Sequence, residues 1–260
     1  MRTDPDHLHE FVDSRSEPAF SRILADHLPL VHGTAVRRVH GDSHLAQDIT
    51  QLVFVDLATK AAELPKGMPL AGWLYRHTCF KAAEVLRATQ RRRQREVVAA
   101  HDRALQPGDS DPDWSRLSPV LDDALADLTP ADREALVLRF LAQRSLRDVG
   151  LALGLSEDAA QKRVARALDR LRQILERRGI ASTAAALAAA VGAHATPPVP
   201  AGLAATITAA VLPHLATVQT PGIIAAAWHW WRTGSSLRHA GIAALVAIAP
   251  LLVQQVRIAT

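Results

Sequence analysis

The sequence predicts an all-α protein, with two small helical domains joined by a flexible linker and followed by a helical C-terminal tail. Of the 260 residues, 48% are hydrophobic but only 4% are aromatic, so the cores must be built mostly from Ala, Leu and Val, which suits helices. Apolar residues recur at helical spacing, and no stretch of useful length alternates with a period of two. Serine, threonine, proline and glycine residues lie where such helices would begin and end.

Composition also excludes several classes of protein. The single cysteine, Cys79, rules out a disulfide scaffold and a CxxC zinc site, and we interpret it as a packing residue. Residues 1–13 are polar and acidic, so we expect no secretory signal and a cytoplasmic protein. There is no nucleotide-binding glycine loop or hydrolase motif, and the pair His40 and His44 has no clear third metal ligand. We therefore expect no enzymatic activity, no cofactor and no metal.

The net charge of +4 is unevenly distributed along the chain. Residues 181–260 contain three arginines but no lysine and no acidic residue, which leaves residues 1–180 with 27 basic and 26 acidic side chains. Overall basicity is therefore no argument for a nucleic-acid partner. Evidence for a nucleic-acid partner must come instead from where the basic residues lie.

The first segment, residues 6–96, reads as a series of helices. Ser16 marks the start of one helix, and we expect Pro29 to end it. Ser43 is expected to cap a long helix further on. The predicted helices cover residues 19–27, 30–39, 43–57 and 70–93.

The last of these helices ends in a cluster of arginines. Arg87, Arg91 and Arg95 share one helix face, with Arg92 and Arg93 beside them. Like charges at this spacing repel one another unless they are solvated or face phosphates. A solvated basic end and a nucleic-acid contact are both consistent with this pattern.

The second segment, residues 118–178, carries the sharpest local signal. Thr129, Ser145 and Ser156 are each expected to cap a helix. Gly154 lies between the last two helices and supplies the positive φ that a sharp helix–helix turn needs. The pattern therefore indicates a helix-turn-helix.

The helix after Ser156 has two distinct faces, one of small and apolar residues and one of cations. Such a helix fits the major groove of DNA, where Arg and Lys bond to guanine edges or phosphates and Gln can read adenine. An ordinary helical hairpin with a solvated basic face is the alternative. The residues predicted to contact DNA here are Ser156, Gln161, Lys162, Arg163, Arg166 and Arg170.

Sequence runs in both segments resemble motifs of one known family. DLTPADRE at residues 127–134, followed by LVLRF, is how region 4 of RNA polymerase sigma factors of the extracytoplasmic-function (ECF) type usually opens. DITQLVF at residues 48–54 is similar to the family's polymerase-binding signature D-x-x-Q-[DE]-x-F, with Leu52 where an acid is usual. Trp73 matches the start of the family's promoter-opening helix, whereas Phe80 stands where many members have Asn.

The resemblance implies a sigma factor whose partners are core RNA polymerase, promoter DNA and, in one reading, an anti-sigma factor. Residues 6–96 would be a region 2-like domain that binds polymerase and the −10 element, and residues 118–178 a region 4-like domain that reads the −35 element. A helix-turn-helix regulator that binds DNA without polymerase is the alternative. The implied polymerase contacts are Asp48, Gln51 and Phe54. A position for Phe54 in the protein core is an equally open alternative. The implied −10 contacts are Lys81, Arg87, Arg91, Arg92 and Arg95.

Residues 97–117 read as a flexible, acidic linker, because they are rich in turn formers and poor in apolar residues. A fully extended chain of this length reaches about 70 Å. Two promoter elements roughly two helical turns apart are separated by a similar distance, at ~35 Å per turn. The linker is therefore long enough, with little slack.

The third segment, residues 181–260, is Ala-rich and has no acidic residue. Residues 239–256 are mostly apolar, close to the ~20 residues that span a bilayer, but Pro250 interrupts them. A membrane helix that tethers the protein to the inner face of the cytoplasmic membrane and a helix that packs on the other domains both stay open. Shorter apolar stretches predict ordinary helices at residues 184–190 and 203–212.

Overall fold

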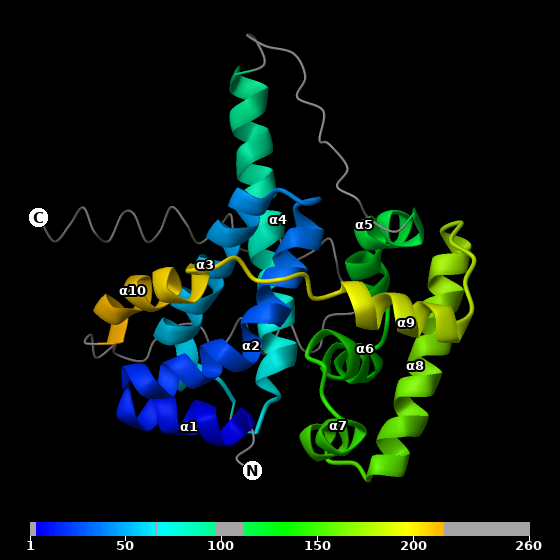
Figure 1. Cartoon of the computed structure of the whole chain (residues 1–260), viewed down its shortest axis with the longest axis horizontal. Coiled ribbons are helices and arrows are strands. Elements are labelled where there is room, and N and C mark those ends of the chain that lie inside the picture. The colour runs from blue at the N-terminus through cyan, green and yellow to red at the C-terminus, as the bar shows by residue number, and fades with distance from the viewer. Residues whose placement is uncertain (1–3, 66, 97–111, 216–260) are drawn as a thin grey trace, which may run out of the picture. The chain divides into compact units, whose positions relative to one another are not determined.

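The structure, a computed structural model, describes residues 4–65, 67–96 and 112–215, and every regular element in these ranges is a helix (Figure 1). This confirms the predicted fold class. The described residues all lie within one compact unit, residues 1–218. The helices are α1 (Asp4–Ser14), α2 (Glu17–Arg38), α3 (Ser43–Lys60), η1 (Ala61–Glu63), α4 (Leu70–Glu96), α5 (Pro112–Ala126), α6 (Pro130–Leu136), η2 (Val137–Leu141), α7 (Leu146–Leu153), α8 (Glu157–Arg177), α9 (Ala184–His194) and α10 (Leu203–Leu215).

Helices α1–α4 form what we call the first module, with α2 packed against the other three. Ser16 caps α2 as predicted, because its hydroxyl accepts a hydrogen bond from the Ala19 N–H at 3.4 Å. Three fully buried rings lie in the core. The Phe11 and Phe20 centroids are 5.5 Å apart, and Phe20 meets Phe54 edge-on at 6.3 Å.

Pro29 does not end a helix, contrary to the prediction, but lies inside an uninterrupted α2. Proline lacks the N–H that the carbonyl of Ala25 would otherwise bind. Pro29 and Ala25 are both exposed, so water can donate a hydrogen bond to the Ala25 carbonyl. Leu28 and Leu30, on the other side of the helix, are buried. Burial of the apolar side therefore outweighs the missing hydrogen bond.

The start of α3 also differs from the prediction by one residue. Asp42 rather than Ser43 is the N-cap, and its carboxylate accepts a hydrogen bond from the Leu45 N–H at 3.0 Å. A carboxylate at this position also interacts favourably with the positive end of the helix dipole.

Helices α5–α8, with η2, form the second module, which begins earlier than predicted. Residues 112–117, expected to belong to the linker, form the first turns of α5. Proline suits the first turn of a helix. Leu117 is buried in the core of this module and Trp114 packs against that core, which holds the segment in place. The rest of the predicted linker, residues 97–111, lies outside the described residues.

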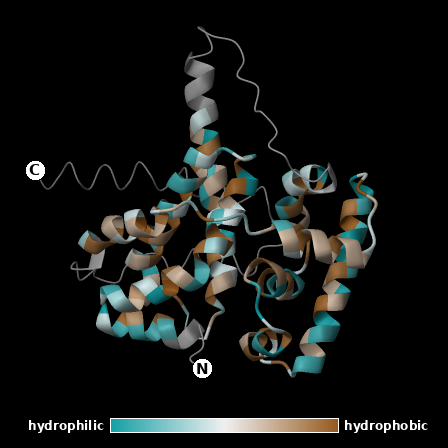
Figure 2. Cartoon of the chain, viewed as in Figure 1, coloured by the Kyte–Doolittle hydropathy of each residue, from teal (hydrophilic) through white to brown (hydrophobic). Residues whose placement is uncertain are grey.

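The N-caps of α6, α7 and α8 in the second module are those that the sequence predicts. Thr129, Ser145 and Ser156 are the N-caps of α6, α7 and α8, and each hydroxyl accepts a hydrogen bond from the backbone N–H three residues later. Helix α8 packs against α5, α6 and α7, and Figure 2 shows hydrophobic and hydrophilic residues on different sides of it. Short local signals thus determine where these helices begin.

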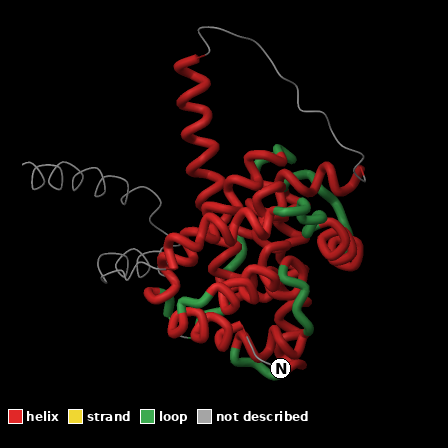
Figure 3. Tube along the Cα trace, turned by 60° about the vertical axis from the view of Figure 1, so that its left-hand side comes forward, coloured by secondary structure: helices red, strands yellow, loops and turns green. Residues whose placement is uncertain are grey.

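Residues 184–215, which we call the extension, form the helices predicted for this part of the chain. Helix α9 packs against α5, η2 and α8 of the second module, whereas α10 packs against α2 and α3 of the first. The extension therefore crosses from one module to the other. The two modules also contact each other directly, through α2 and α5 and through α4 and η2. Figure 3 shows these described segments as helices connected by short loops.

Candidate nucleic-acid interface

The turn between α7 and α8 has the geometry that a helix-turn-helix requires. Gly154 has a φ of 65°, the left-handed conformation predicted for it. The Leu155 N–H donates to the Gly150 carbonyl at 2.8 Å, and a Cβ at Gly150 would lie 2.8 Å from the Leu155 carbonyl oxygen. Gly150 is therefore a second glycine that the turn needs. Sequence analysis missed it, although its position four residues before Gly154 was a usable signal.

Helix α8 separates its apolar and polar residues as predicted. Ser156 accepts a hydrogen bond from the Ala159 N–H at 3.2 Å, and two acidic residues lie in the first turn. The side that packs against the module buries Ala160, Val164, Ala167, Leu168, Leu171, Ile174 and Leu175. Ser156, Gln161, Lys162 and Arg166 are exposed, and Arg163 is half-buried.

Arg170 differs from the other predicted DNA contacts on α8. Its guanidinium forms an ion pair with Asp132 of α6, and that carboxylate also accepts the Thr129 hydroxyl at 2.8 Å. Arg170 therefore has a partner within its own module and connects α8 to the start of α6. The sequence shows Arg170 on the cationic face of this helix. It does not reveal the partner, because Asp132 lies 38 residues away along the chain.

The predicted −10 contacts on α4 fall into two groups. Lys81 forms ion pairs with Asp56 at 3.0 Å and Glu84 at 3.4 Å, whereas the side chain of Arg87 is exposed. The backbone of α4 continues to Glu96. The side chains of Arg91, Arg92 and Arg95 lie outside the described part of the chain.

Asp56 is the centre of a charged cluster between α3 and α4. Its Oδ2 lies 2.8 Å from His77 Nε2, 3.0 Å from Lys81 Nζ and 3.5 Å from Lys60 Nζ. Partial burial acts to raise the pKa of the Asp56 carboxyl, but the hydrogen bonds from His77 and Lys81 prevail and hold it well below its ordinary range.

The Asp56 cluster predicts a loss of stability in acid. The carboxyl protonates at lower pH in the folded chain than in the unfolded chain, where its pKa is about 3.9. Its contribution is therefore fully present above the unfolded pKa and is lost as pH falls through the lower, folded pKa. Asp56→Asn should lower the free energy of unfolding by about 1.5–3 kcal/mol at pH 7, and by progressively less below about pH 4.

Urea unfolding at a series of pH values measures this effect. Asp48→Asn is the matched control, because it makes the same change at an exposed position on the same helix. If the difference between Asp56→Asn and the parent chain stays constant down to pH 2, Asp56 has no such role.

Three rings form a row on α4, close to the Asp56 cluster. Trp73 and His77 stack with centroids 4.6 Å apart, and His77 and Phe80 stack at 6.4 Å. Trp73 is nearly buried, whereas Phe80 at the other end is 54% exposed. The i, i+4, i+7 spacing was the signal in the sequence that could have found this row.

The predicted polymerase-binding residues on α3 do not all lie at the surface. Asp48 is exposed, Gln51 is half-buried and Leu52 is 44% exposed. Phe54 is fully buried against Phe20, which is the core position that the sequence left open. In this arrangement its ring is not available to a partner.

Comparison with known proteins relates both modules to one family. Residues 23–92 match the family model for Sigma-70 region 2, and residues 124–173 match that for Sigma-70, region 4. The chain is 32% identical over 167 residues to the RNA polymerase sigma factor CarQ of Myxococcus xanthus, across 62% of this chain and 91% of CarQ. This chain belongs to the sigma-70 family of RNA polymerase sigma factors.

A second curated relative is itself named as a sigma factor of the ECF type. The ECF RNA polymerase sigma factor SigE of Mycolicibacterium smegmatis is 28% identical over 167 residues, which covers 63% of this chain and 64% of SigE. Among solved structures, the sigma factor RpoE in its co-crystal structure with the anti-sigma factor NepR, from Bartonella quintana, is 22% identical with a TM-score of 0.31, and covers 60% of this chain and 96% of RpoE.

The two modules of the sigma factor thus contain region 2 and region 4, and the chain is a transcription initiation factor. The extension lies beyond both matched ranges. In the described part of the sigma factor, no helix has the length and apolar character to cross a bilayer. The stretch for which sequence analysis left a membrane helix open, residues 239–256, lies outside the described residues.

Proposed function

We propose that this sigma factor reads the −35 promoter element with α8, holds the −10 region with α4 and binds core polymerase through the exposed side of α3. The observation that carries the proposal is the α7–α8 helix-turn-helix, in which Gln161, Lys162 and Arg166 are exposed on a helix whose other side is buried. The chain itself catalyses no covalent step. It acts in the cytoplasm, where bacterial core polymerase is found.

We infer which side chains of α8 contact DNA from their exposure and from the ion pairs that they already form within the module. Lys162 and Arg166 point away from the module core and suit guanine edges and phosphates, and Gln161 suits adenine. Arg163 is half-buried and lies at the margin of the same surface. Arg170 would have to leave Asp132 before it could reach DNA, so we assign it to the module rather than to the promoter.

The surface of α4 suits both duplex backbone and unpaired bases. Arg87 can contact phosphates. Phe80, the exposed end of the ring row, lies next to Lys81 in the sequence. Stacking of a base on an aromatic side chain contributes about 1–3 kcal/mol. Phe80 therefore offers a site where a base exposed by strand opening can stack, which offsets part of the cost of unstacking it.

Run-off transcription with bacterial core polymerase tests the proposed function. The full chain should direct core polymerase to a defined start site on a promoter with −35 and −10 elements. A folded chain that neither binds core polymerase nor supports run-off transcription would overturn the proposal. Tight binding to duplex DNA without polymerase would favour the stand-alone regulator instead.

Replacing the α8 cations should weaken promoter recognition without unfolding the chain. Arg163→Ala and Arg166→Ala are each expected to cost about 1–3 kcal/mol of promoter binding by the holoenzyme, with discrimination lost at the contacted −35 positions. Arg172→Ala is the matched control, because Arg172 on the same helix pairs with Glu176 at 3.1 Å. Filter binding with −35 variants measures the effect. Unaltered preference in both variants would remove α8 from this role.

A further inference from the structure

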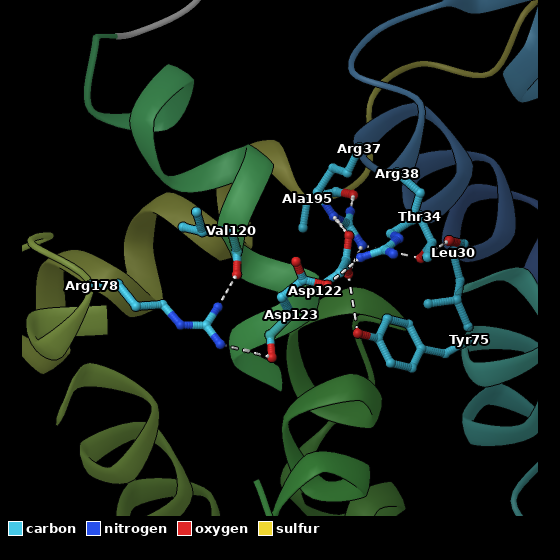
Figure 4. A network of polar contacts seen from close by, with 10 residues as sticks. All are labelled: Leu30, Thr34, Arg37, Arg38, Tyr75, Val120, Asp122, Asp123, Arg178 and Ala195. Atoms are coloured by element: carbon cyan, nitrogen blue, oxygen red, sulfur yellow. Dashed lines mark hydrogen bonds and ion pairs between the residues drawn. The ribbon is translucent and has the colours of Figure 1, made fainter. Parts of the chain in front are cut away.

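Arg37 of α2 is buried where the two modules meet, and it donates hydrogen bonds to three parts of the chain (Figure 4). Its Nε and Nη2 donate to the two carboxylate oxygens of Asp122 on α5, each at 3.1 Å, and Nη2 also donates to Thr34 Oγ1 at 3.1 Å. Nη1 donates to the backbone carbonyl of Ala195 in the extension. Tyr75 of α4 donates its hydroxyl to Asp122 at 3.1 Å.

This network keeps its charges although it is buried. Burial alone would lower the pKa of Arg37, but Asp122 raises it, so the guanidinium stays charged. Burial also raises the pKa of Tyr75 well above its ordinary value, so the phenol remains a donor. A buried ion pair adds little net stability but requires its own partners. The network therefore favours one arrangement of the modules, in addition to the apolar contacts that Leu30, Ala71 and Tyr75 make with the core of the second module.

Other contacts bring the modules close together around Arg37. Arg76 of α4 pairs with Glu134 of α6 at 2.8 Å, and Arg38 of α2 pairs with Asp123 of α5 at 2.6 Å. A Cβ at Gly72 would overlap the Glu134 carboxylate, so that carboxylate lies directly against the α4 backbone. The closed arrangement is thus closely fitted along α4 as well as α2.

The segment that follows α9 crosses this junction and is held at both sides. On the second module, the ring of His194 stacks on Trp114 at 5.5 Å, and Gln143 donates to the Thr196 hydroxyl at 3.1 Å. On the first module, the segment lies against Gly33 of α2, where a Cβ would be 2.5 Å from the Ala195 carbonyl oxygen. Only a residue without a side chain allows this approach.

Helix α10 then packs on α2 and α3 through a small number of apolar side chains. Leu203, Ile207 and Val211 are buried at one-turn spacing, while the intervening alanines are mostly exposed. Helix α3 is the helix that presents Asp48 and Leu52. A contact with so few anchors on that helix can be displaced by a larger partner.

We propose that the extension is an internal clamp that holds the two sigma modules closed, and that core polymerase must displace it. This inference rests on the proposed function, because two modules that bind elements about 70 Å apart, at ~35 Å per helical turn, have to separate. If only a minor fraction of the chain is open, the apparent affinity for polymerase is reduced by that fraction. Opening the clamp should therefore tighten binding.

The first pair of variants uses two glycines in helices. Gly33→Ala places a methyl group against the Ala195 carbonyl, whereas Gly192→Ala in α9 places the same group in open space. Both changes favour the helix that carries them. Only Gly33→Ala should release the crossing segment.

The second pair changes charge on α10. Ile207→Asp places a carboxylate at a fully buried position, whereas Ala205→Asp makes the same change at an exposed one. A carboxylate cannot stay in the apolar contact with α2 and α3. Ile207→Asp should therefore detach α10 by a route that is independent of Gly33.

Fluorescence energy transfer in the full chain measures opening without polymerase. The dyes are placed on cysteines introduced at the exposed Ala62 and Arg177, one on each module. All variants carry Cys79→Ala, so that the two introduced cysteines are the only thiols in the chain. Titration with core polymerase measures binding, and circular dichroism checks that each variant keeps its helices.

We expect Gly33→Ala and Ile207→Asp to lower transfer efficiency and to bind core polymerase roughly tenfold more tightly, while both control variants match the parent chain. Unchanged transfer in both release variants would overturn the clamp. Lower transfer without tighter binding would show that the extension does not oppose polymerase, and would also overturn it. If no form of the chain binds core polymerase, the failure lies with the proposed function.

Discussion

Arg37→Leu is expected to lower the free energy of unfolding of the chain, with its two modules closed, by about 3–5 kcal/mol. The substitution leaves Asp122 buried with its main cationic partner removed, and it also takes away the donors to Ala195 and Thr34. An unpaired buried carboxylate costs far more than the net value of the original pair. Guanidinium chloride unfolding followed by circular dichroism measures the loss.

Two control variants separate the buried pair from a general effect of removing an arginine. Arg38→Leu removes the neighbouring guanidinium, whose partner Asp123 is 61% exposed, and should cost less than about 1 kcal/mol. Combining Arg37→Leu with Asp122→Leu should recover much of the lost stability, because neither charge is then left alone. Equal losses for Arg37→Leu and Arg38→Leu would contradict the assignment.

Phe54→Ala is the second large effect, also of about 3–5 kcal/mol in the free energy of unfolding. Phe54 is fully buried and meets Phe20 edge-on, so removing the ring leaves a cavity in the core of the first module. Thermal and urea unfolding both report the change. The expected loss follows from packing alone and requires no contact with polymerase.

Leu52 and Phe54 are close neighbours with opposite expected results. Leu52→Ala changes an exposed side chain, so stability should stay within about 0.5 kcal/mol while the affinity for core polymerase falls. Phe54→Leu should retain the fold and bind core polymerase as the parent chain does. A folded Phe54→Leu variant that cannot bind polymerase would restore Phe54 to the polymerase contact.

Local signals in the sequence predicted where α6, α7 and α8 of the second module begin. The N-caps Thr129, Ser145 and Ser156 and the left-handed Gly154 all act through hydrogen bonds and sterics within a few residues. The same locality explains why the two faces of α8 were predictable. A helix stripe records which side is apolar, whatever that side packs against.

Pro29 and the start of α5 show where local reasoning was wrong. Proline inside α2 is tolerated because its free carbonyl partner faces solvent and the opposite side of the helix is buried. Residues 112–117 are helical because Trp114 and Leu117 pack on a core assembled from distant parts of the chain. In both places burial outweighs the intrinsic preference of the backbone.

By itself, the sequence determined that the protein is helical, which helices would carry cations and where the turn between α7 and α8 lies. Only the tertiary structure decided that Phe54 is a core residue, that Arg170 pairs with Asp132, and that Arg37 meets Asp122 across 85 residues of chain. The physical reason is the separation along the chain between the residues that interact. Caps and periodicity act within a turn or two of helix, whereas a buried charge can take its partner from any part of the chain that folding brings beside it.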